Sequence, residues 1–319
     1  MNYKRYVIGL VCLYFISIII VWLLAWFLPA EYYMDTEYVY WKQQKDYITS
    51  DGDQQEILLL GDSRIKTGII VKELGDNVYN LSIGGATPIE MYYTLKIYME
   101  HHPKPKSIIV AFGPMHFTEM SCYWDRNLYF HYLNRDMVHE VDEVLAANGE
   151  LSKQSYPYLY RLPSIYTKQI IKNLLHPRTK KNMEVYKKAA ESKGRLFFEY
   201  KEMTEVLSDE SKENEFRLLL TLDYYMNQLL TLCKNEGIPV YIEQMPLGED
   251  SYPIMSSNGY LDSYKEYMHS FAQKYKIPVE EVMPVFENKY FGDNSHLNEE
   301  GARIITKQWK MKYKDLFNN

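Results

Sequence analysis

The sequence predicts a three-layer α/β domain, with helices on both faces of a parallel sheet, behind one membrane-spanning helix. Short apolar runs alternate with segments of helical spacing, which implies right-handed crossovers between parallel strands. An uncharged run from Tyr6 to Leu28, about 23 residues long, can cross a hydrocarbon core of roughly 30 Å as a helix. The 319 residues carry a formal net charge of −6 and three cysteines. This composition argues against a nucleic-acid partner and excludes a disulfide-framework protein.

The charges around the apolar run predict its orientation. Basic residues precede it and acidic residues follow it (Lys4 and Arg5, then Glu31, Asp35 and Glu37). By the positive-inside rule, residues 1–5 are a cytoplasmic tail, residues 6–28 a single-pass anchor, and the rest of the chain lies outside the cell membrane. A cleaved signal peptide is the alternative. The run is longer than a typical signal core and no Ala-x-Ala site follows it, which favours an uncleaved anchor.

Residues 29–55 are polar and rich in tyrosine, and we interpret them as a stalk before a domain that spans residues 56–319. Apolar runs predict strands at 56–60, 78–81, 107–112, 238–243 and 278–282. Helical patterns begin near residue 63 and cover residues 88–100, 213–235, 260–275 and 298–316. Pro88 suits a first helical turn, Gly237 ends a helix, and Asn298 is expected to cap the last one.

The alternation lapses between about residues 117 and 212, which we interpret as a partly helical insertion that forms a cap or a docking surface. Residues 168–201 within it are basic. Such a stretch is either a solvated helix face or a surface for an anionic polymer or lipid headgroups. The sequence leaves open whether Cys122 and Cys233 pair.

Ligands of open α/β sheets bind beyond the carboxyl ends of the strands, so the loops there carry the candidate chemistry. Ser63 follows the first strand directly and is expected to begin a helix, whose N-terminus favours developing negative charge. A serine needs an adjacent base to become a nucleophile, and His296 is the candidate. Asp293, three residues before His296, can hold the other imidazole nitrogen. Each piece alone is also typical of a turn or a helix cap.

Together these motifs resemble the SGNH (GDSL-type) hydrolase superfamily. The residues that carry the resemblance are Gly61-Asp62-Ser63, Gly84-Gly85, Asp293-x-x-His296 and the following Leu297 to Ala302. The resemblance covers roughly residues 57–316 without the insertion and implies a flavodoxin-like three-layer fold. It implies that Ser63 is the nucleophile, His296 the base and Asp293 its partner. The backbone N–H groups of Ser63 and of Gly84 or Gly85 would form the oxyanion hole.

One block departs from that family. Its third motif is normally Gly-x-Asn-Asp, whose Asn donates to the oxyanion, whereas this chain has Gly113-Pro114-Met115-His116. Loss of one such donor typically lowers the rate about 10²–10³-fold. We expect His116 to serve a structural or substrate-binding role rather than to replace the Asn. Asp62, Arg64 and Gln244 are further candidates for substrate contacts.

The anchor, the insertion and the altered block make the chain similar to membrane-anchored SGNH-like proteins of cell-envelope O-acylation, such as those of alginate O-acetylation and lipoteichoic-acid D-alanylation. That similarity implies an acyl donor, an envelope glycan or polyol acceptor, and a membrane-bound O-acyltransferase (MBOAT) partner. An O-deacetylase or esterase of the same fold and a non-catalytic scaffold subunit are the alternatives. The sequence has no Gly-x-x-x-x-Gly-Lys-[Ser/Thr] or Gly-x-Gly-x-x-Gly motif, and we expect neither a cofactor nor a metal.

Overall fold

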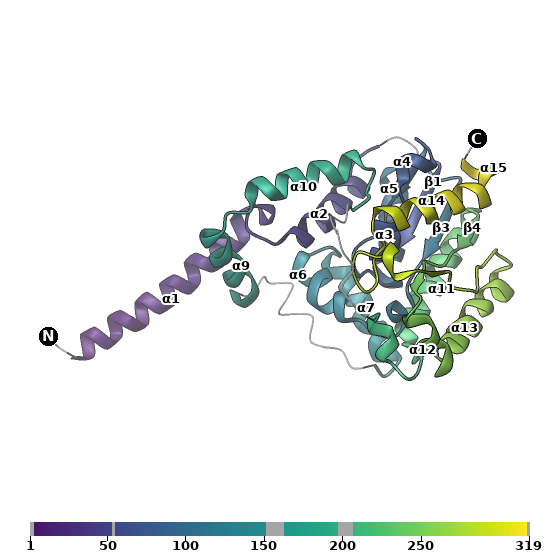
Figure 1. Cartoon of the computed structure of the whole chain (residues 1–319). Helices are drawn as coiled ribbons and strands as arrows, with labels where there is room; N and C mark the ends of the chain where they lie inside the picture. Colours follow the sequence, from purple (N-terminus) through teal and green to yellow (C-terminus); the bar gives the residue numbers. More distant parts are fainter. Residues whose placement is uncertain (1–2, 53–54, 151–162, 197–206, 318–319) are drawn as a thin grey trace.

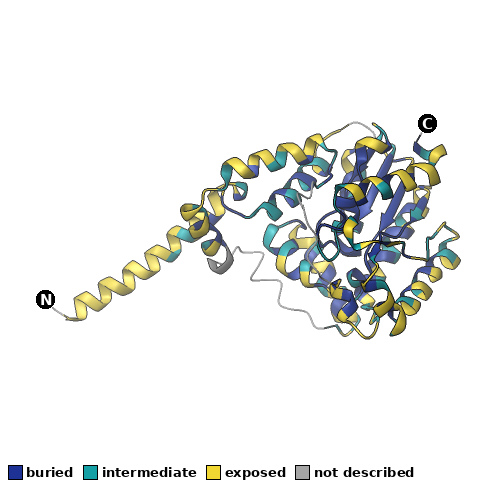
Figure 2. Ribbon diagram, viewed as in Figure 1, coloured by how far each residue is buried: buried dark blue, intermediate teal, exposed yellow. Residues whose placement is uncertain are grey.

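The computed structural model describes residues 3–52, 55–150, 163–196 and 207–317. The first helix, α1 (Tyr3–Phe27), projects away from the rest of the protein (Figure 1). It has 25 residues and is long and apolar enough to cross a membrane. Its side chains are exposed almost throughout, with Ala25 as its buried residue (Figure 2).

A four-stranded parallel sheet forms the centre of the domain. The strands are β1 (Ile57–Gly61), β2 (Val78–Asn80), β3 (Ser107–Ala111) and β4 (Val240–Ile242), in the order β2-β1-β3-β4. Ile57 of β1 pairs with Val78 on one side and Ser107 on the other. Four of the five predicted strands are thus confirmed. The fifth, at 278–282, is reduced to one parallel bridge between Ile242 and Val279, because β4 itself ends at Ile242.

Helices cover both faces of this sheet, as the alternating pattern predicted. Leu58 and Leu60 point into one core, and Ile57 and Leu59 into the other, because successive strand residues face opposite sides. The first core contains residues of α5 (Pro88–His101), α11 (Leu220–Asn235) and α13 (Tyr260–Tyr275). The second contains residues of α3 (Ser63–Gly68), α4 (Val71–Leu74), α14 (Glu299–Lys312) and α15 (Lys314–Phe317). In Figure 2 the buried strands lie between these helices.

Capping explains where several helices begin. Thr87 and Glu90 form a reciprocal capping box at α5, with Pro88 in its first turn. Asn298 caps α14 as predicted, and accepts from the N–H groups of Glu300 and Gly301. The helix predicted from residue 213 begins only at Leu220. The seven residues before it are not helical, and the Leu219 N–H donates to the Phe117 carbonyl at 2.9 Å.

Residues 29–55 do not form the predicted stalk. They contain a short 3-10 helix, η1 (Ala30–Tyr32), and the helix α2 (Thr36–Thr49). Trp41 of α2 is only 1% exposed. The Gln43 amide donates to the Tyr79 hydroxyl at 2.9 Å, and the Gln44 amide to the Asn80 carbonyl at 3.2 Å. The polar residues that suggested a stalk are therefore partners of β2, and this segment is part of the folded domain.

The predicted insertion is partly helical, although residues 151–162 and 197–206 lie outside the described ranges. Its elements are η3 (Tyr123–Asn127, a π-helix), α6 (Leu128–Phe130), α7 (Arg135–Ala147), α9 (Pro163–Leu175), α10 (Thr179–Glu191) and η4 (Asp209–Lys212), preceded by η2 (Pro114–Phe117). Its described helices pack on the rest of the protein and not as a separate cap, since α7 joins the first core, α9 packs on α1 and α10 packs on α2 (Figure 1). Cys122 and Cys233 are free thiols and do not pair.

A second, two-stranded parallel sheet was not predicted. It consists of β5 (Leu247–Gly248) and β6 (Val285–Phe286), whose strands are too short to show a sequence period. The helix α12 (Ser251–Ser257) follows β5, and a 3-10 turn, η5 (Asn288–Tyr290), follows β6. This region leads the chain back to the loop before α14, where Asp293 and His296 lie.

Candidate active site

Ser63 is the first residue of α3 and follows the end of β1 after a single residue. Asp62 caps this helix through a 2.7 Å hydrogen bond from the Arg64 N–H. Gly61 has φ +154°, and a Cβ there would lie 1.8 Å from the Ala111 carbonyl oxygen. Only glycine allows β1 to approach β3 this closely at the point where the chain turns. The turn places the Ser63 side chain at the carboxyl end of the sheet.

The structure brings the three predicted catalytic side chains into one hydrogen-bonded chain. His296 Nε2 lies 2.7 Å from Ser63 Oγ, across 233 positions of sequence. His296 Nδ1 lies 2.8 Å from Asp293 Oδ2 and 3.0 Å from Oδ1. When Nδ1–H donates to the carboxylate, Nε2 is left as the acceptor for the serine hydroxyl. The arrangement is suited to removing a proton from Ser63.

Local hydrogen bonds hold the loop that carries Asp293 and His296. The N–H groups of Ser295 and His296 donate to Asp293 Oδ1 at 2.9 and 2.7 Å. Burial alone would raise the pKa of the Asp293 carboxyl, but the hydrogen bond and charge of His296, with these two N–H groups, lower it overall. A bridge between Phe291 and Leu297 closes the loop just before α14. Asp293 is therefore kept ionised as the partner of the imidazole.

The predicted oxyanion donors border the same cavity as Ser63 and His296. Within the described ranges, no acceptor takes the backbone N–H of Ser63, Gly84 or Gly85. A Cβ on Gly84 would lie 2.5 Å from Glu37 Oε1, and one on Gly85 would lie 2.2 Å from Cys122 Sγ. The two glycines thus allow neighbouring side chains to approach the loop, and their N–H groups remain available to a bound ligand.

Gly85→Ala should lower the reactivity of Ser63 by about 10²-fold or more, the usual effect of losing one oxyanion donor. The new methyl group would collide with Cys122, and Gly85 has φ +73°, a conformation that side chains disfavour. The rate of serine labelling by a fluorophosphonate probe measures the effect. Adding Cys122→Ala removes the colliding sulfur and should restore part of the rate. If both variants reacted as fast as the native protein, Gly85 would have no part in the site.

The cavity beside the triad has a volume of about 340 Å³, and its lining combines polar and charged residues with a larger apolar surface. Arg64 and His116 are among the residues that line this cavity, and a substrate contact for them stays a prediction. Its other lining residues include Glu37, Thr87, Met115, Glu119, Ser121, Arg126, Leu196, Asp209 and Asn294. Cavities of this size accommodate small ligands.

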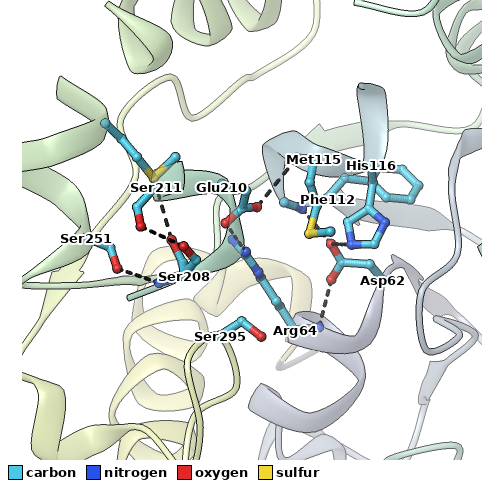
Figure 3. A network of polar contacts seen from close by, with 12 residues as sticks. Asp62, Arg64, Phe112, Met115, His116, Ser208, Glu210, Ser211, Ser251 and Ser295 are labelled. Atoms are coloured by element: carbon cyan, nitrogen blue, oxygen red, sulfur yellow. Dashed lines mark hydrogen bonds and ion pairs between the residues drawn. The ribbon is translucent and has the colours of Figure 1, made fainter. Parts of the chain in front are cut away.

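Asp62 is fully buried, and it joins the loops of the first and third motifs (Figure 3). Its Oδ2 accepts from the Gly113 N–H at 2.6 Å and lies 3.1 Å from His116 Nε2. Burial lowers the pKa of His116, although the charge of Asp62 opposes the shift. Asp62 therefore positions other groups and does not line the cavity, contrary to the substrate contact predicted for it.

Gln244 also lies away from the cavity. It is fully buried, its amide nitrogen donates to the Glu280 carbonyl at 3.2 Å, and its amide oxygen accepts from the Tyr264 hydroxyl at 2.9 Å. A strand-end position suggested a substrate contact, but tertiary packing uses the amide to connect β4 to its neighbours. Gln244 is thus a structural residue.

Glu37 and Arg126 border the cavity and were not identified from the sequence. Arg126 Nη1 donates to Glu37 Oε1 and to the Gly84 carbonyl, both at 3.2 Å, and the Trp41 indole N–H donates to the same Glu37 oxygen at 3.3 Å. Glu37 comes from the segment interpreted as a stalk, and Arg126 from the insertion. No local sequence signal connects either residue to Ser63, because the contacts exist only in the folded chain.

Lys66, on α3, is 1% exposed and contacts the loop that precedes Gly84. Its amine donates to the carbonyls of Ser82 and Gly194, both at 2.8 Å. Burial lowers the pKa of the Lys66 amine to about 7, opposed by the charge of Glu37. Neutral or charged, the amine has enough N–H groups for both carbonyls. It connects α3 to the loop before Gly84 and to the turn that follows α10.

Lys66→Met should lower the free energy of unfolding by about 2–4 kcal/mol, because two buried carbonyls lose their donor. The effect should depend on pH. Between pH 7 and 10.5 the unfolded chain binds a proton at Lys66 that the folded chain does not, so native stability rises with pH there and is constant below about 7. Denaturant unfolding at pH 7 and pH 9.5 tests this. The difference between native protein and variant should be larger at pH 9.5, and an equal difference would contradict a neutral buried amine.

No protein-family model and no curated protein sequence matches the chain. The description of the fold and of the triad therefore comes from the structure alone.

Proposed function

We propose that the protein is a membrane-anchored serine acyltransferase of SGNH type, which acts outside the cell membrane on hydroxyl groups of an envelope polysaccharide or polyol. The hydrogen-bonded chain from Ser63 through His296 to Asp293 carries this proposal. A hydroxyl, an imidazole and a carboxylate in this order are the groups needed for acyl transfer through a covalent intermediate. The resemblance to SGNH motifs agrees with the same residues in the same roles.

The first half of the reaction acylates Ser63. Its Oγ attacks the carbonyl carbon of an acyl ester while His296 Nε2 accepts the hydroxyl proton. The negative charge on the carbonyl oxygen is stabilised by the N–H groups of Ser63 and of Gly84 or Gly85. The bond to the leaving alcohol then breaks, and His296 returns the proton to the leaving oxygen. Asp293 stabilises the imidazolium between these steps.

The second half releases the acyl group to an acceptor. His296 takes the proton of an acceptor hydroxyl, whose oxygen attacks the acyl carbon, and the proton then returns to Ser63 as the new ester leaves. The carboxylates and amides around the cavity, such as Glu119, Asp209 and Asn294, support a polyhydroxylated acceptor. Water in the same position would make the protein an O-deacetylase or esterase. The partial exposure of the His296 side chain, 19%, allows water to reach it.

The N-terminal charges support an arrangement in which α1 anchors the protein with its first residues in the cytoplasm. Acyl groups made in the cytoplasm must then cross the membrane before they reach Ser63. An MBOAT-type membrane protein beside α1 is the partner proposed to supply them. The absence of the third-motif Asn favours the alternative of a non-catalytic scaffold subunit. The complete triad of Ser63, His296 and Asp293 favours catalysis.

Labelling with a fluorophosphonate and steady-state transfer together test this function. The full-length protein in detergent should be labelled at Ser63, and Ser63→Ala and His296→Ala should not be labelled. With p-nitrophenyl acetate as donor, a burst of nitrophenol should precede turnover that accelerates when a polyol is added. A burst without acceleration favours the esterase. A folded native protein that takes no label would favour the scaffold and end the catalytic proposal.

A further inference from the structure

We propose that α9 is an interfacial helix, immersed in the outer leaflet of the membrane that α1 spans, with a cationic edge placed at the lipid headgroups. The proposal rests on α1 as the membrane anchor and adds a second contact with the bilayer. Most of the basic stretch noted in the sequence lies on α9 and α10, and Lys201 lies outside the described ranges. Neither α9 nor α10 contributes a residue to the wall of the cavity beside the triad.

The position of α9 along α1 sets its depth. Tyr166 and Ile170 of α9 pack in one cluster with Ala25 of α1, and Val21 packs against the same cluster. Both α1 residues lie inside the apolar run that must be in hydrocarbon if α1 spans the membrane. A helix in contact with them is therefore at the level of the last turns of the anchor. Figure 1 shows α9 beside the end of α1 that meets the domain.

A second face of α9 is apolar and uncovered. Ile171, Leu174 and Leu175 are 52%, 75% and 71% exposed. At roughly 100° per residue these three form one arc, next to the buried arc of Tyr166 and Ile170. Exposed aliphatic side chains gathered on one side of a helix mark an interaction surface. This arc continues the exposed apolar surface of α1, which is a surface for lipid.

The next arc around the helix is cationic. Lys168 and Lys172 follow the leucines in angle, and both are exposed. Lys180 and Lys181 extend the charge onto the first turn of α10, where the Thr179 hydroxyl donates to the Tyr32 carbonyl just after α1 at 3.2 Å. Lysines beside an apolar arc reach headgroup phosphates while their stems stay in the apolar layer. A second copy of the chain would bring like charges together on this edge, so the charge pattern favours an anionic lipid surface.

Hydrogen bonds connect α9 and α10 to the turn between α1 and α2. The Gln169 amide donates to Asp35 Oδ2 at 3.2 Å, and the Asn182 amide donates to the carbonyls of Glu31 and Met34 at 2.7 and 3.0 Å. The turn between α1 and α2 is thus held by both α9 and α10. Immersion of α9 would fix the tilt of the whole domain against the bilayer, because α2 is part of the domain core.

Lipid quenching of a fluorophore on Leu174→Cys tests the immersion. The full chain carries Cys12→Ala and Cys122→Ala, leaving the buried Cys233, and is placed in nanodiscs of phosphatidylcholine and phosphatidylglycerol. An NBD label at 174 should show blue-shifted emission, and lipids spin-labelled near the headgroup should lower its fluorescence about twofold, the result for a helix in the headgroup and acyl boundary. The matched control is Met311→Cys on α14, 63% exposed, which should be neither shifted nor quenched.

The outcomes separate this proposal from its premise. Protein that does not enter nanodiscs would show that α1 is not an anchor, and would overturn both proposals. Protein that enters while the label at 174 behaves as in water would overturn only the immersion of α9. A blue-shifted label without lipid quenching would indicate a protein partner or second copy, and would also overturn it.

The charged edge has its own test in the same nanodiscs. Removing the phosphatidylglycerol should reduce quenching at position 174, and Lys168→Gln with Lys172→Gln should abolish that dependence on lipid charge. Lys307→Gln with Lys314→Gln, two exposed lysines at the other end of the protein, should leave the dependence intact. If the two double variants showed the same dependence of quenching on lipid charge, a headgroup role for α9 would be contradicted.

Discussion

Ser63→Ala is expected to lower acyl transfer by roughly 10⁵–10⁶-fold, the scale seen when a serine nucleophile is removed from a triad. Ser63 Oγ lies 2.7 Å from His296 Nε2, so the variant loses the hydroxyl that the imidazole would activate. Folding should change little, by about 1 kcal/mol or less, because the serine side chain is only partly buried. Burst kinetics with p-nitrophenyl acetate measure the loss, and thermal unfolding measures the stability.

The control for this variant is Ser256→Ala on α12, an exposed serine outside the cavity. It should keep the native rate and the native unfolding temperature. Retention of transfer within tenfold by Ser63→Ala would remove Ser63 from the role of nucleophile. A large loss of stability in the same variant would instead identify Ser63 as a structural residue.

Arg64→Met is expected to lower the free energy of unfolding by about 3–5 kcal/mol, the usual cost of leaving one charge of a buried ion pair without its partner. The Arg64 guanidinium pairs with Glu210, and their side chains are 4% and 0% exposed. Figure 3 shows the pair beside the loop that carries Met115 and His116. Glu210 Oε1 also accepts from the Met115 N–H at 3.5 Å, so η4 is held to the third motif by the same carboxylate.

The double variant Arg64→Met with Glu210→Met removes both charges and should recover most of the lost stability. Denaturant unfolding of the two variants and the native protein gives the comparison. If the double variant did not recover stability, lost packing and not the unpaired carboxylate would account for most of the destabilisation. The exposed pair of Lys187 and Glu191 on α10 is the matched control, and Lys187→Met should cost less than about 1 kcal/mol.

The sheet and the triad could be predicted because their signals are local. A short apolar run ending in Gly61, followed by Ser63, specifies a strand, a turn and a helix start within a few residues. Asp293 and His296 lie on one loop at a spacing that allows their side chains to meet. Asn298, a favourable N-cap residue, predicts the start of the helix that follows them. Parallel topology then brings the two ends together, since both lie at the carboxyl edge of the sheet.

The rest of the site could not be predicted because its residues act at long range. Glu37 reaches Gly84 through Arg126, and these groups belong to three distant segments. Gln43 and Gln44 are polar in sequence but buried in the structure, which is why α2 was mistaken for a stalk. Polarity predicts exposure only when the hydrogen-bonding partner is water, and here the partners are Tyr79 and Asn80.

The short path from α1 to the cavity limits how far from the membrane the proposed active site can act. Glu37, in the cavity wall, lies nine positions after Leu28, a span of at most about 32 Å even for fully stretched chain. If α1 is embedded, Ser63 is tethered within a few nanometres of the bilayer. If the proposed acyl transfer is correct, a polymer extending through the whole envelope would be modified only near its root, and modification farther out would require the polymer to grow past Ser63.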